Sequence, residues 1–155
     1  PRYFICNEKF VNLSNKKIKK IKNILITFGG SDLEECSLKI VKILLRTFSK
    51  VNIKIIIGPF FKRKLIKNLK KISIFNNNVK CVNFSENFID LINSSDFIIS
   101  NSGLTKYELC MTNKPVMVYS ENSTNALINS PFKAKKLCYH ISFKDTEKKI
   151  RKKLN

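Results

Sequence analysis

The most informative part of this sequence is ILITFGGSD, residues 24–32. Five mostly apolar residues, Ile24–Phe28, lead directly into two glycines, a serine and an aspartate. Residues 33–49 then place Leu33, Cys36 and Ile40 at the spacing of one helical face. The stretch predicts a buried strand, a tight loop and a helix, in that order.

The same alternation continues to the end of the chain. Further apolar strands are predicted at Ile53–Ile57, Val79–Phe84, Phe97–Ser100, Val116–Tyr119 and Leu137–Ile141. Helices are predicted at 60–72, 86–94, 102–112, 123–136 and 144–154. Strands that are apolar throughout and alternate with helices are typical of a parallel sheet covered on both faces. The pattern predicts an α/β, Rossmann-like, doubly wound sheet of about six strands.

Residues 23–155 are expected to form this domain, a normal size for a single one. Residues 1–22 lack a clear period and contain the basic run Lys16–Lys22. We interpret them as a linker, or the fringe of an N-terminal domain missing from this sequence.

The chain of 155 residues carries 30 Lys+Arg against 11 Asp+Glu, a formal charge of +19. The basic residues are 26 Lys and 4 Arg, and Arg is the residue favoured for bidentate recognition of phosphates and bases. Lys, Asn and Ile share A/T-rich codons, so a Lys-rich solvated surface explains the charge and no specific nucleic-acid partner is expected. The basic segments 16–22 and 62–71 are expected to add weak attraction to an anionic membrane surface.

The number and spacing of the cysteines bear on the cellular compartment and on metal binding. The five are far apart in sequence and include no C-x-x-C pair: Cys6, Cys36, Cys81, Cys110 and Cys138. Neither a metal cluster nor a disulfide framework is predicted. No signal peptide or membrane span is recognisable. We expect reduced thiols in a cytoplasmic protein, with peripheral association at the inner membrane face as an option.

The loop at Gly29, Gly30, Ser31 and Asp32 is a candidate phosphate site. Ligands of parallel sheets bind outside the carboxyl ends of the strands, where the strand order reverses. Two glycines let the backbone approach an anion, and the following helix start supplies free N–H groups. The alternative is a tight turn in which Ser31 or Asp32 caps the helix.

A second candidate lies at residues 100–108. There a strand ends in small polar residues, Gly103 opens a helix, and Glu108 lies about one and a half turns inside it. A diphosphate at the helix start would bring a ribose within reach of the Glu108 carboxylate. The alternative is a surface Glu108 paired with Lys106 or Lys114.

Four motifs resemble one protein family. They are ILITFGGSD at 24–32, IIIGP at 55–59, SDFIISNSGLTKYELC at 95–110 and KPVMVYSEN at 114–122. They resemble the C-terminal half of the UDP-sugar hydrolase of pseudaminic acid biosynthesis and the related spore coat polysaccharide proteins. More distantly they are similar to the peptidoglycan N-acetylglucosaminyltransferase, and all of these have the GT-B fold. The resemblance spans roughly residues 23–142.

The resemblance implies a UDP-sugar site. It assigns the phosphates to the loop at residues 29–32, and the diphosphate and ribose to Ser102, Gly103, Leu104, Thr105 and Glu108. It places Gly58 and Ser85 near the base and sugar, and Glu121 and Asn122 near the sugar or phosphate. The family's hydrolases usually have Gln after that Asn, where this chain has Ser123.

No catalytic residue is assigned, because the family's catalytic His lies in an N-terminal G-x-G-H segment that has no counterpart here. The single histidine, His140, lies in a predicted strand without an acidic, Cys or Ser partner in local register, and is expected to be structural.

The sequence therefore predicts the UDP-sugar-binding half of a GT-B nucleotide-sugar hydrolase for surface polysaccharide or nonulosonic acid biosynthesis. No metal or other cofactor is expected, since helix termini can stabilise the diphosphate. The first alternative is the equivalent half of a glycosyltransferase for cell-surface glycans. A basic nucleic-acid-binding domain is the second, and it is disfavoured because most of the twelve Phe occupy core-period positions.

Overall fold

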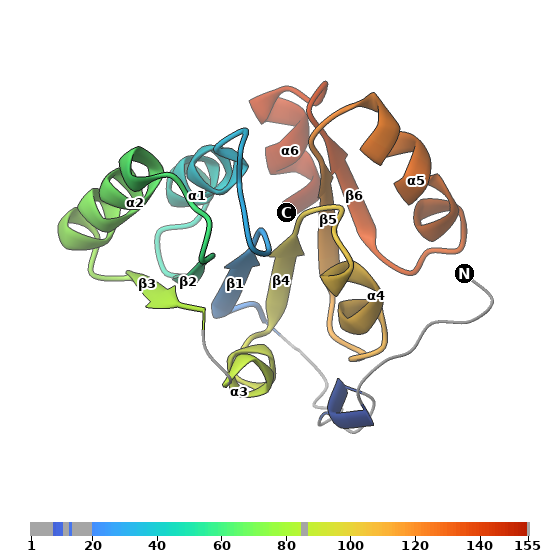
Figure 1. The fold of residues 1–155 in the computed structure, drawn as a ribbon, viewed down its shortest axis with the longest axis horizontal. Helices are drawn as coiled ribbons and strands as arrows, with labels where there is room; N and C mark the ends of the chain where they lie inside the picture. Colours follow the sequence, from blue (N-terminus) through green and yellow to red (C-terminus); the bar gives the residue numbers. More distant parts are fainter. Residues whose placement is uncertain (1–7, 11–12, 14–19, 85–86, 155) are drawn as a thin grey trace.

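A computed structural model describes residues 8–10, 13, 20–84 and 87–154 (Figure 1). Ser85, the Lys16–Lys19 part of the basic run and Cys6 lie outside these residues. The strands are β1 Asn23–Thr27, β2 Asn52–Ile57, β3 Val79–Asn83, β4 Phe97–Ser100, β5 Val116–Ser120 and β6 Tyr139–Ser142. The helices are α1 Cys36–Thr47, α2 Arg63–Phe75, α3 Phe88–Asn93, α4 Thr105–Cys110, α5 Ser123–Ala134 and α6 Glu147–Leu154, and a short 3-10 helix spans Glu8–Phe10.

The six strands form one parallel sheet in the order β3-β2-β1-β4-β5-β6. The predicted Rossmann-like, doubly wound fold is therefore confirmed. The chain runs outward from β1 to β3, then returns to place β4 on the other side of β1. The strand order thus reverses between β1 and β4, and their carboxyl ends form the crevice in which ligands of such sheets bind.

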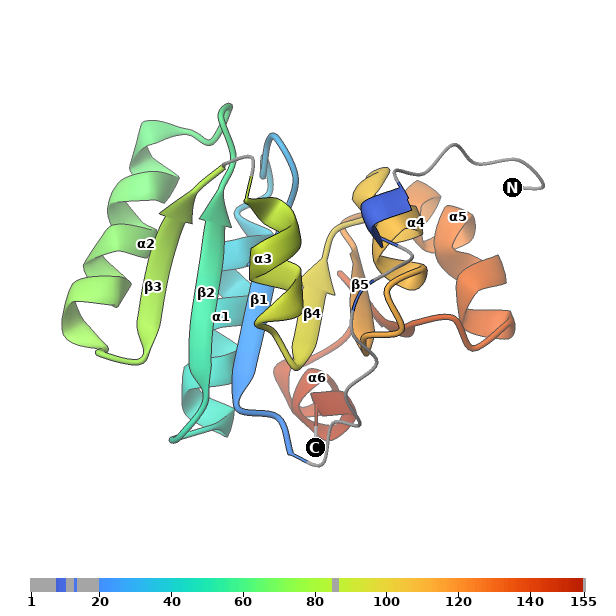
Figure 2. The same cartoon turned by 90° about the horizontal axis from the view of Figure 1, so that it is seen from below.

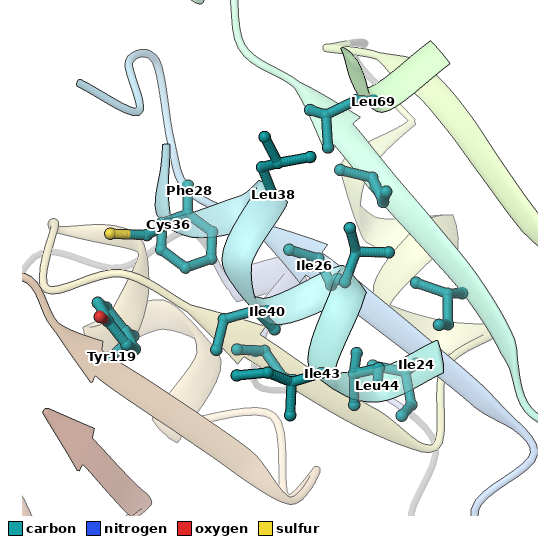
Figure 3. Packing of buried hydrophobic residues seen from close by; sticks show 14 of the residues in the cluster. Ile24, Ile26, Phe28, Cys36, Leu38, Ile40, Ile43, Leu44, Leu69 and Tyr119 are labelled. Carbon is teal, nitrogen blue, oxygen red and sulfur yellow. The ribbon is translucent and has the colours of Figure 1, made fainter. Parts of the chain in front are cut away.

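Helices cover both faces of the sheet, as Figures 1 and 2 show. Side chains alternate along β1, so that Ile24 and Ile26 join the core under α1, α2 and α6, while Leu25 joins the core on the opposite face. Figure 3 shows the first of these cores, where Ile40 and Leu44 of α1 lie against the sheet. Burial on both faces explains why the inner strands β1, β4 and β5 are mostly apolar, whereas the edge strands β3 and β6 include polar and exposed residues.

The second core lies beneath α3 and α4 and contains Ile92 and Leu109. Phe10 and Leu13, from the N-terminal 22 residues, are buried in the same cluster. Phe132 of α5 contacts Tyr107 of α4, with ring centroids 5.0 Å apart. The α5 helix thereby packs beside α4.

The helix predicted at 102–112 is shorter in the structure, where α4 begins only at Thr105. Its predicted first turn is a loop because the Gly103 N–H donates to the Asn101 side chain, Oδ1, at 3.2 Å. A side chain that bonds to the backbone two residues later favours a turn over a helix. In the part of the chain that the structure describes, no helix is long and apolar enough to cross a membrane.

Candidate functional site

The loops after β1 and β4 are joined by Asn101, which was not among the predicted site residues. Its Nδ2 donates to the Phe28 carbonyl at 3.0 Å, and its Oδ1 accepts from the Gly103 N–H. Gly29 lies beside this amide with φ of 68°, a conformation that favours glycine. The two predicted phosphate loops therefore form one continuous edge across the point where the strand order reverses.

Asp32 caps α1. It is 1% exposed, its Oδ1 accepts from the Cys36 N–H and its Oδ2 accepts from the Ser37 N–H, both at 2.8 Å. Of the two roles considered for Asp32, the structure shows the helix cap. Its carboxylate therefore occupies the start of α1. The anion-accessible part of this loop is therefore Gly29, Gly30 and the exposed Ser31.

Gly58 supports the same loop from β2. A Cβ atom at Gly58 would overlap the carbonyl oxygens of Gly29 and Gly30, so only glycine permits this approach. The Phe60 N–H donates to the Gly30 carbonyl at 2.9 Å, and the exposed Phe60 ring lies over Gly30. The structure thus gives Gly58, expected near the base and sugar, a packing role against the glycine loop.

Glu108 lies one helical turn after Thr105 on α4 and is half-buried. Burial raises the pKa of its carboxyl above the usual range. Among the described residues, Glu108 has no hydrogen-bond or ion-pair partner in the structure. Lys106 donates instead to Ser102 and Asn129, and Lys114 donates to the carbonyls of Asn93 and Ser95. In the structure, Glu108 therefore pairs with neither Lys106 nor Lys114.

The loop before α4 rests on a buried polar network. Lys106 is 1% exposed, and its Nζ donates to the Asn129 Oδ1 at 2.7 Å and the Ser102 carbonyl at 3.1 Å. Asn129 Nδ2 donates to the hydroxyls of Ser102 and Ser120 at 2.7 and 2.8 Å. Ser102 Oγ in turn donates to the Tyr119 carbonyl. Because the Ser102 hydroxyl is engaged within the chain, only its backbone N–H is available to a ligand.

His140 extends this network. Its Nε2 lies 2.6 Å from Ser120 Oγ, a partner 20 residues away in sequence and therefore outside the local register that the sequence shows. In the parallel pairing of β5 with β6, Val118 lies opposite His140. Ser120 follows Val118 by two residues, so its side chain points to the same face of the sheet as that of His140. Burial, together with Lys153 and Lys133, lowers the pKa of His140. Ser120 is fully buried and already bonded to Asn129, so this pair is structural.

Glu121 and Asn122 follow β5 on the same edge of the sheet. Asn122 caps α5, because its Oδ1 accepts from the Asn125 N–H at 2.8 Å. Burial and the nearby Asp32 raise the pKa of Glu121, while a hydrogen bond from Asn101 lowers it. Glu121 therefore lies against the loop that joins the two predicted phosphate sites.

Asp32, Cys36 and Glu121 have ligand atoms within 4.8 Å of one another, the arrangement of a possible metal site. Burial, Asp32 and Glu121 raise the pKa of Cys36 to about 12, so its thiol is protonated at neutral pH. Both Asp32 oxygens already accept backbone N–H groups. Helix capping explains the cluster, and we assign it no metal.

Ser85 and Leu104 are two further predicted site positions. Ser85 lies outside the described residues. Leu104 is 75% exposed beside Gly103, so it presents an apolar side chain at the edge of the site. The remaining predicted positions gather along the carboxyl ends of β1, β2, β4 and β5, except Glu108, which lies one turn along α4.

Comparison with known proteins supports a glycosyltransferase-like fold. The structure is similar to MurG of Acinetobacter baumannii, with a TM-score of 0.62 and 16% identity over 89% of this chain and 41% of that one. It is similar to heptosyltransferase WaaC of E. coli, solved with ADP, with a TM-score of 0.59 and 12% identity over 92% and 45% of the chains. A third similar structure is HepE of Anabaena in complex with UDP-glucose, with a TM-score of 0.54 and 13% identity over 75% and 40%.

These likenesses show the fold. The chain has the Rossmann-like architecture of one half of a GT-B glycosyltransferase. An uncharacterized protein of Methanocaldococcus jannaschii is 33% identical over 128 residues, which are 79% of this chain and 26% of that protein. The chain thus spans about a quarter of that relative and less than half of each similar structure. No protein-family model matches the sequence.

Proposed function

We propose that this chain is the nucleotide-sugar-binding half of a glycosyltransferase for cell-surface glycans, with a UDP-sugar as its ligand. The observation that carries the proposal is Glu108, a half-buried carboxylate that has no partner among the described residues and lies on the helix after the glycine-bearing loop that follows β4. Leaving such a group without a hydrogen bond is costly, and the two hydroxyls of a ribose would satisfy it.

The diphosphate would lie across the loops after β1 and β4. The backbone of Gly29 and Gly30 is open there, and the Ser31 hydroxyl is exposed. Among the described residues, the N–H groups of Leu104 and Thr105 have no acceptor in the chain. Backbone donors and a hydroxyl are the groups that stabilise a departing nucleoside diphosphate. Asp32 is left out of this assignment because its carboxylate caps α1.

The similar structures support the same ligand class. HepE was solved with UDP-glucose and WaaC with ADP, and both have the fold of this chain. Glycosyl transfer also fits these neighbours better than hydrolysis. A UDP-sugar hydrolase is the second candidate, favoured by the four sequence motifs quoted above. Both reactions would use the same half-site, and they differ in what approaches the sugar.

A second domain is proposed to close the site. Large apolar side chains are exposed in the loops after β1, β2 and β4, at Leu33 (65%), Phe60 (76%) and Leu104 (75%). They surround the crevice between β1 and β4 along the carboxyl edge of the sheet. Exposed apolar groups gathered at one edge are typical of an interaction surface. We infer that the N-terminal half of a longer protein covers them.

Calorimetric titration with UDP, uridine and ADP tests the proposal. We expect saturable UDP binding that Glu108→Gln weakens about ten- to a hundredfold, the effect of losing one charge-assisted hydrogen bond. Because burial raises the pKa of Glu108, the carboxylate is lost on acidification at a pH above the ordinary glutamate range, and binding should weaken there too.

Asp90→Asn is the matched control, since it removes the same charge from an exposed position on α3. It should leave UDP affinity unchanged. Equal affinities of wild type and Glu108→Gln for UDP would remove Glu108 from the site. Absence of saturable UDP binding would overturn the proposal as a whole.

A further inference from the structure

The positive charge of this protein is concentrated in one third of the chain. Between Cys36 and Ser85 the sequence has twelve Lys or Arg residues and neither Asp nor Glu. This stretch forms α1, β2, α2 and β3, which make up one side of the molecule, with α2 outermost (Figure 1). It accounts for +12 of the net +19. A compositional bias toward Lys explains an excess of cations over the whole surface, but not their concentration on one side.

The α2 helix has two apolar faces where one is needed for folding. Leu65 and Leu69 are fully buried against the sheet. Ile74 lies on the opposite side of the helix and is 76% exposed, its neighbour Phe75 is 75% exposed, and the half-buried Ile66 packs against the first core. Ile74 and Phe75 form a second apolar face at the end of α2, and side chains of this kind so exposed are unusual on a surface helix.

Cations flank this second face. A shallow groove along α2 is lined by Arg63, Ile66, Lys67, Lys70, Lys71 and Ile74. Their spacing of three and four residues places them on one side of the helix. A neighbouring groove, between α1 and α2, brings Lys42 beside Phe75. The surface thus combines basic and apolar side chains along the length of one helix.

None of the α2 cations is neutralised within the described structure. The ion pairs found there use Asp145 and Glu147 as acids and join them to Arg46, Lys149, Arg151 and Lys153. The helix α2 and the neighbouring α1 and β3 contain no acidic residue. The positive potential of α2 is therefore directed outward, available to an anionic partner.

We propose that the outer face of α2 docks this protein on the surface of an anionic phospholipid bilayer. The cations would contact lipid headgroups, while Ile74 and Phe75 enter the interface between headgroups and acyl chains. A nucleic acid would satisfy the lysines, but its phosphate backbone offers nothing to two neighbouring aliphatic and aromatic side chains at the end of the helix. The mixed basic and apolar character therefore favours the bilayer.

Co-sedimentation with vesicles tests this docking. Wild type should bind vesicles of phosphatidylcholine mixed with phosphatidylglycerol, bind pure phosphatidylcholine vesicles weakly, and lose affinity as salt rises. The triple variant Lys67→Glu, Lys70→Glu, Lys71→Glu should bind the anionic vesicles about a hundredfold or more weakly, at roughly fivefold per lysine near the surface. The double variant Ile74→Ser, Phe75→Ser should lose about tenfold through its apolar contribution.

The control triple variant is Lys133→Glu, Lys135→Glu, Lys148→Glu, which makes the same charge change at exposed positions of α5, its C-terminal end and α6. It should lose only a few-fold, about what long-range attraction supplies. Circular dichroism of every variant checks that the fold is retained. Equal loss in both triple variants, no effect of the Ile74–Phe75 change, or binding to a DNA duplex but not to vesicles would each overturn the proposal.

Discussion

Single residues with long-range partners hold the loops of the candidate site in place. Lys106 lies in the interior and forms no ion pair with a described carboxylate, and burial lowers its pKa. Its ammonium is satisfied by a carbonyl, an amide and the rings of Tyr107 and Phe132, at 5.0 and 5.2 Å from their centroids. A buried charge persists only with such compensation. Lys106 therefore fixes the loop before α4 against α5.

Asp145 is a second residue whose charge is structural, and its effect on stability depends on pH. Burial alone would raise the pKa of its carboxyl, but Lys149 at 2.6 Å, Lys153 at 2.8 Å and the Ser142 N–H bring it down to about 2. A lowered folded-state pKa stabilises the protein above the ordinary value of 3.8, and the stabilisation is lost as the pH falls from there to about 2.

Asp145→Asn should therefore lower the free energy of unfolding by about 2 kcal/mol at pH 7. The difference from wild type should shrink toward zero near pH 2, and urea denaturation across this range measures it. The exposed Asp90→Asn serves as control and should stay within about 0.5 kcal/mol of wild type. A deficit for Asp145→Asn that does not change with pH would show that the carboxylate charge is not the cause.

At the scale of elements, the site depends on how closely the loops after β1 and β2 approach. Gly58 has no side chain, and the carbonyls of Gly29 and Gly30 lie where one would be. The Phe60 N–H then bonds to the Gly30 carbonyl. The glycine loop after β1 is thus held by its close packing against the end of β2 and by the hydrogen bond from Asn101.

Gly58→Ala should push this loop away from β2. We expect an unfolding free energy lower by about 1–3 kcal/mol, the usual effect of forcing an extra methyl group into a packed site. Gly30→Ala is a matched control for stability, because its Cβ would meet only the exposed Phe60 ring, at 3.4 Å. Chemical denaturation compares the two variants. Similar stabilities would contradict the close packing of Gly58.

The elements themselves were predictable because most of the strands are apolar runs followed by a loop and a helix. The ends of helices were less predictable. The α4 helix starts three residues later than predicted, because the Gly103 N–H donates a hydrogen bond to the Asn101 side chain. The sequence left two roles for Asp32, a phosphate contact or a helix cap. The hydrogen bonds from the Cys36 and Ser37 N–H groups show that it is the cap.

At the scale of the whole molecule, the parallel topology places residues that are far apart in sequence at one crevice. Asn101 reaches Phe28 across 73 residues, and Lys106 reaches Asn129 across 23. No local pattern marks such pairs, so the polar network around Lys106, Asn129 and Ser120 was missed. The His140–Ser120 contact was missed for the same reason, because it depends on the register of β5 and β6.

The molecule divides its surface between two proposed tasks. The crevice between β1 and β4 presents backbone donors, an exposed hydroxyl and the carboxylate of Glu108, which has no partner in the described part of the chain, to a nucleotide sugar. The outer face of α2, beyond the β2–β3 side of the sheet, presents cations and apolar side chains. If the outer face of α2 lies on a bilayer, the crevice at the carboxyl ends of β1 and β4 would open parallel to the membrane. Substrates on the membrane surface could then reach it.

The most direct test of the central claim is to map UDP binding by amide chemical shifts in uniformly labelled protein. We predict saturable shifts at Gly29, Gly30, Leu104, Thr105 and Glu121, and none along the outer face of α2. Shifts centred on α2, or their absence at UDP concentrations in the millimolar range expected to saturate a weak half-site, would contradict a nucleotide-sugar site between β1 and β4.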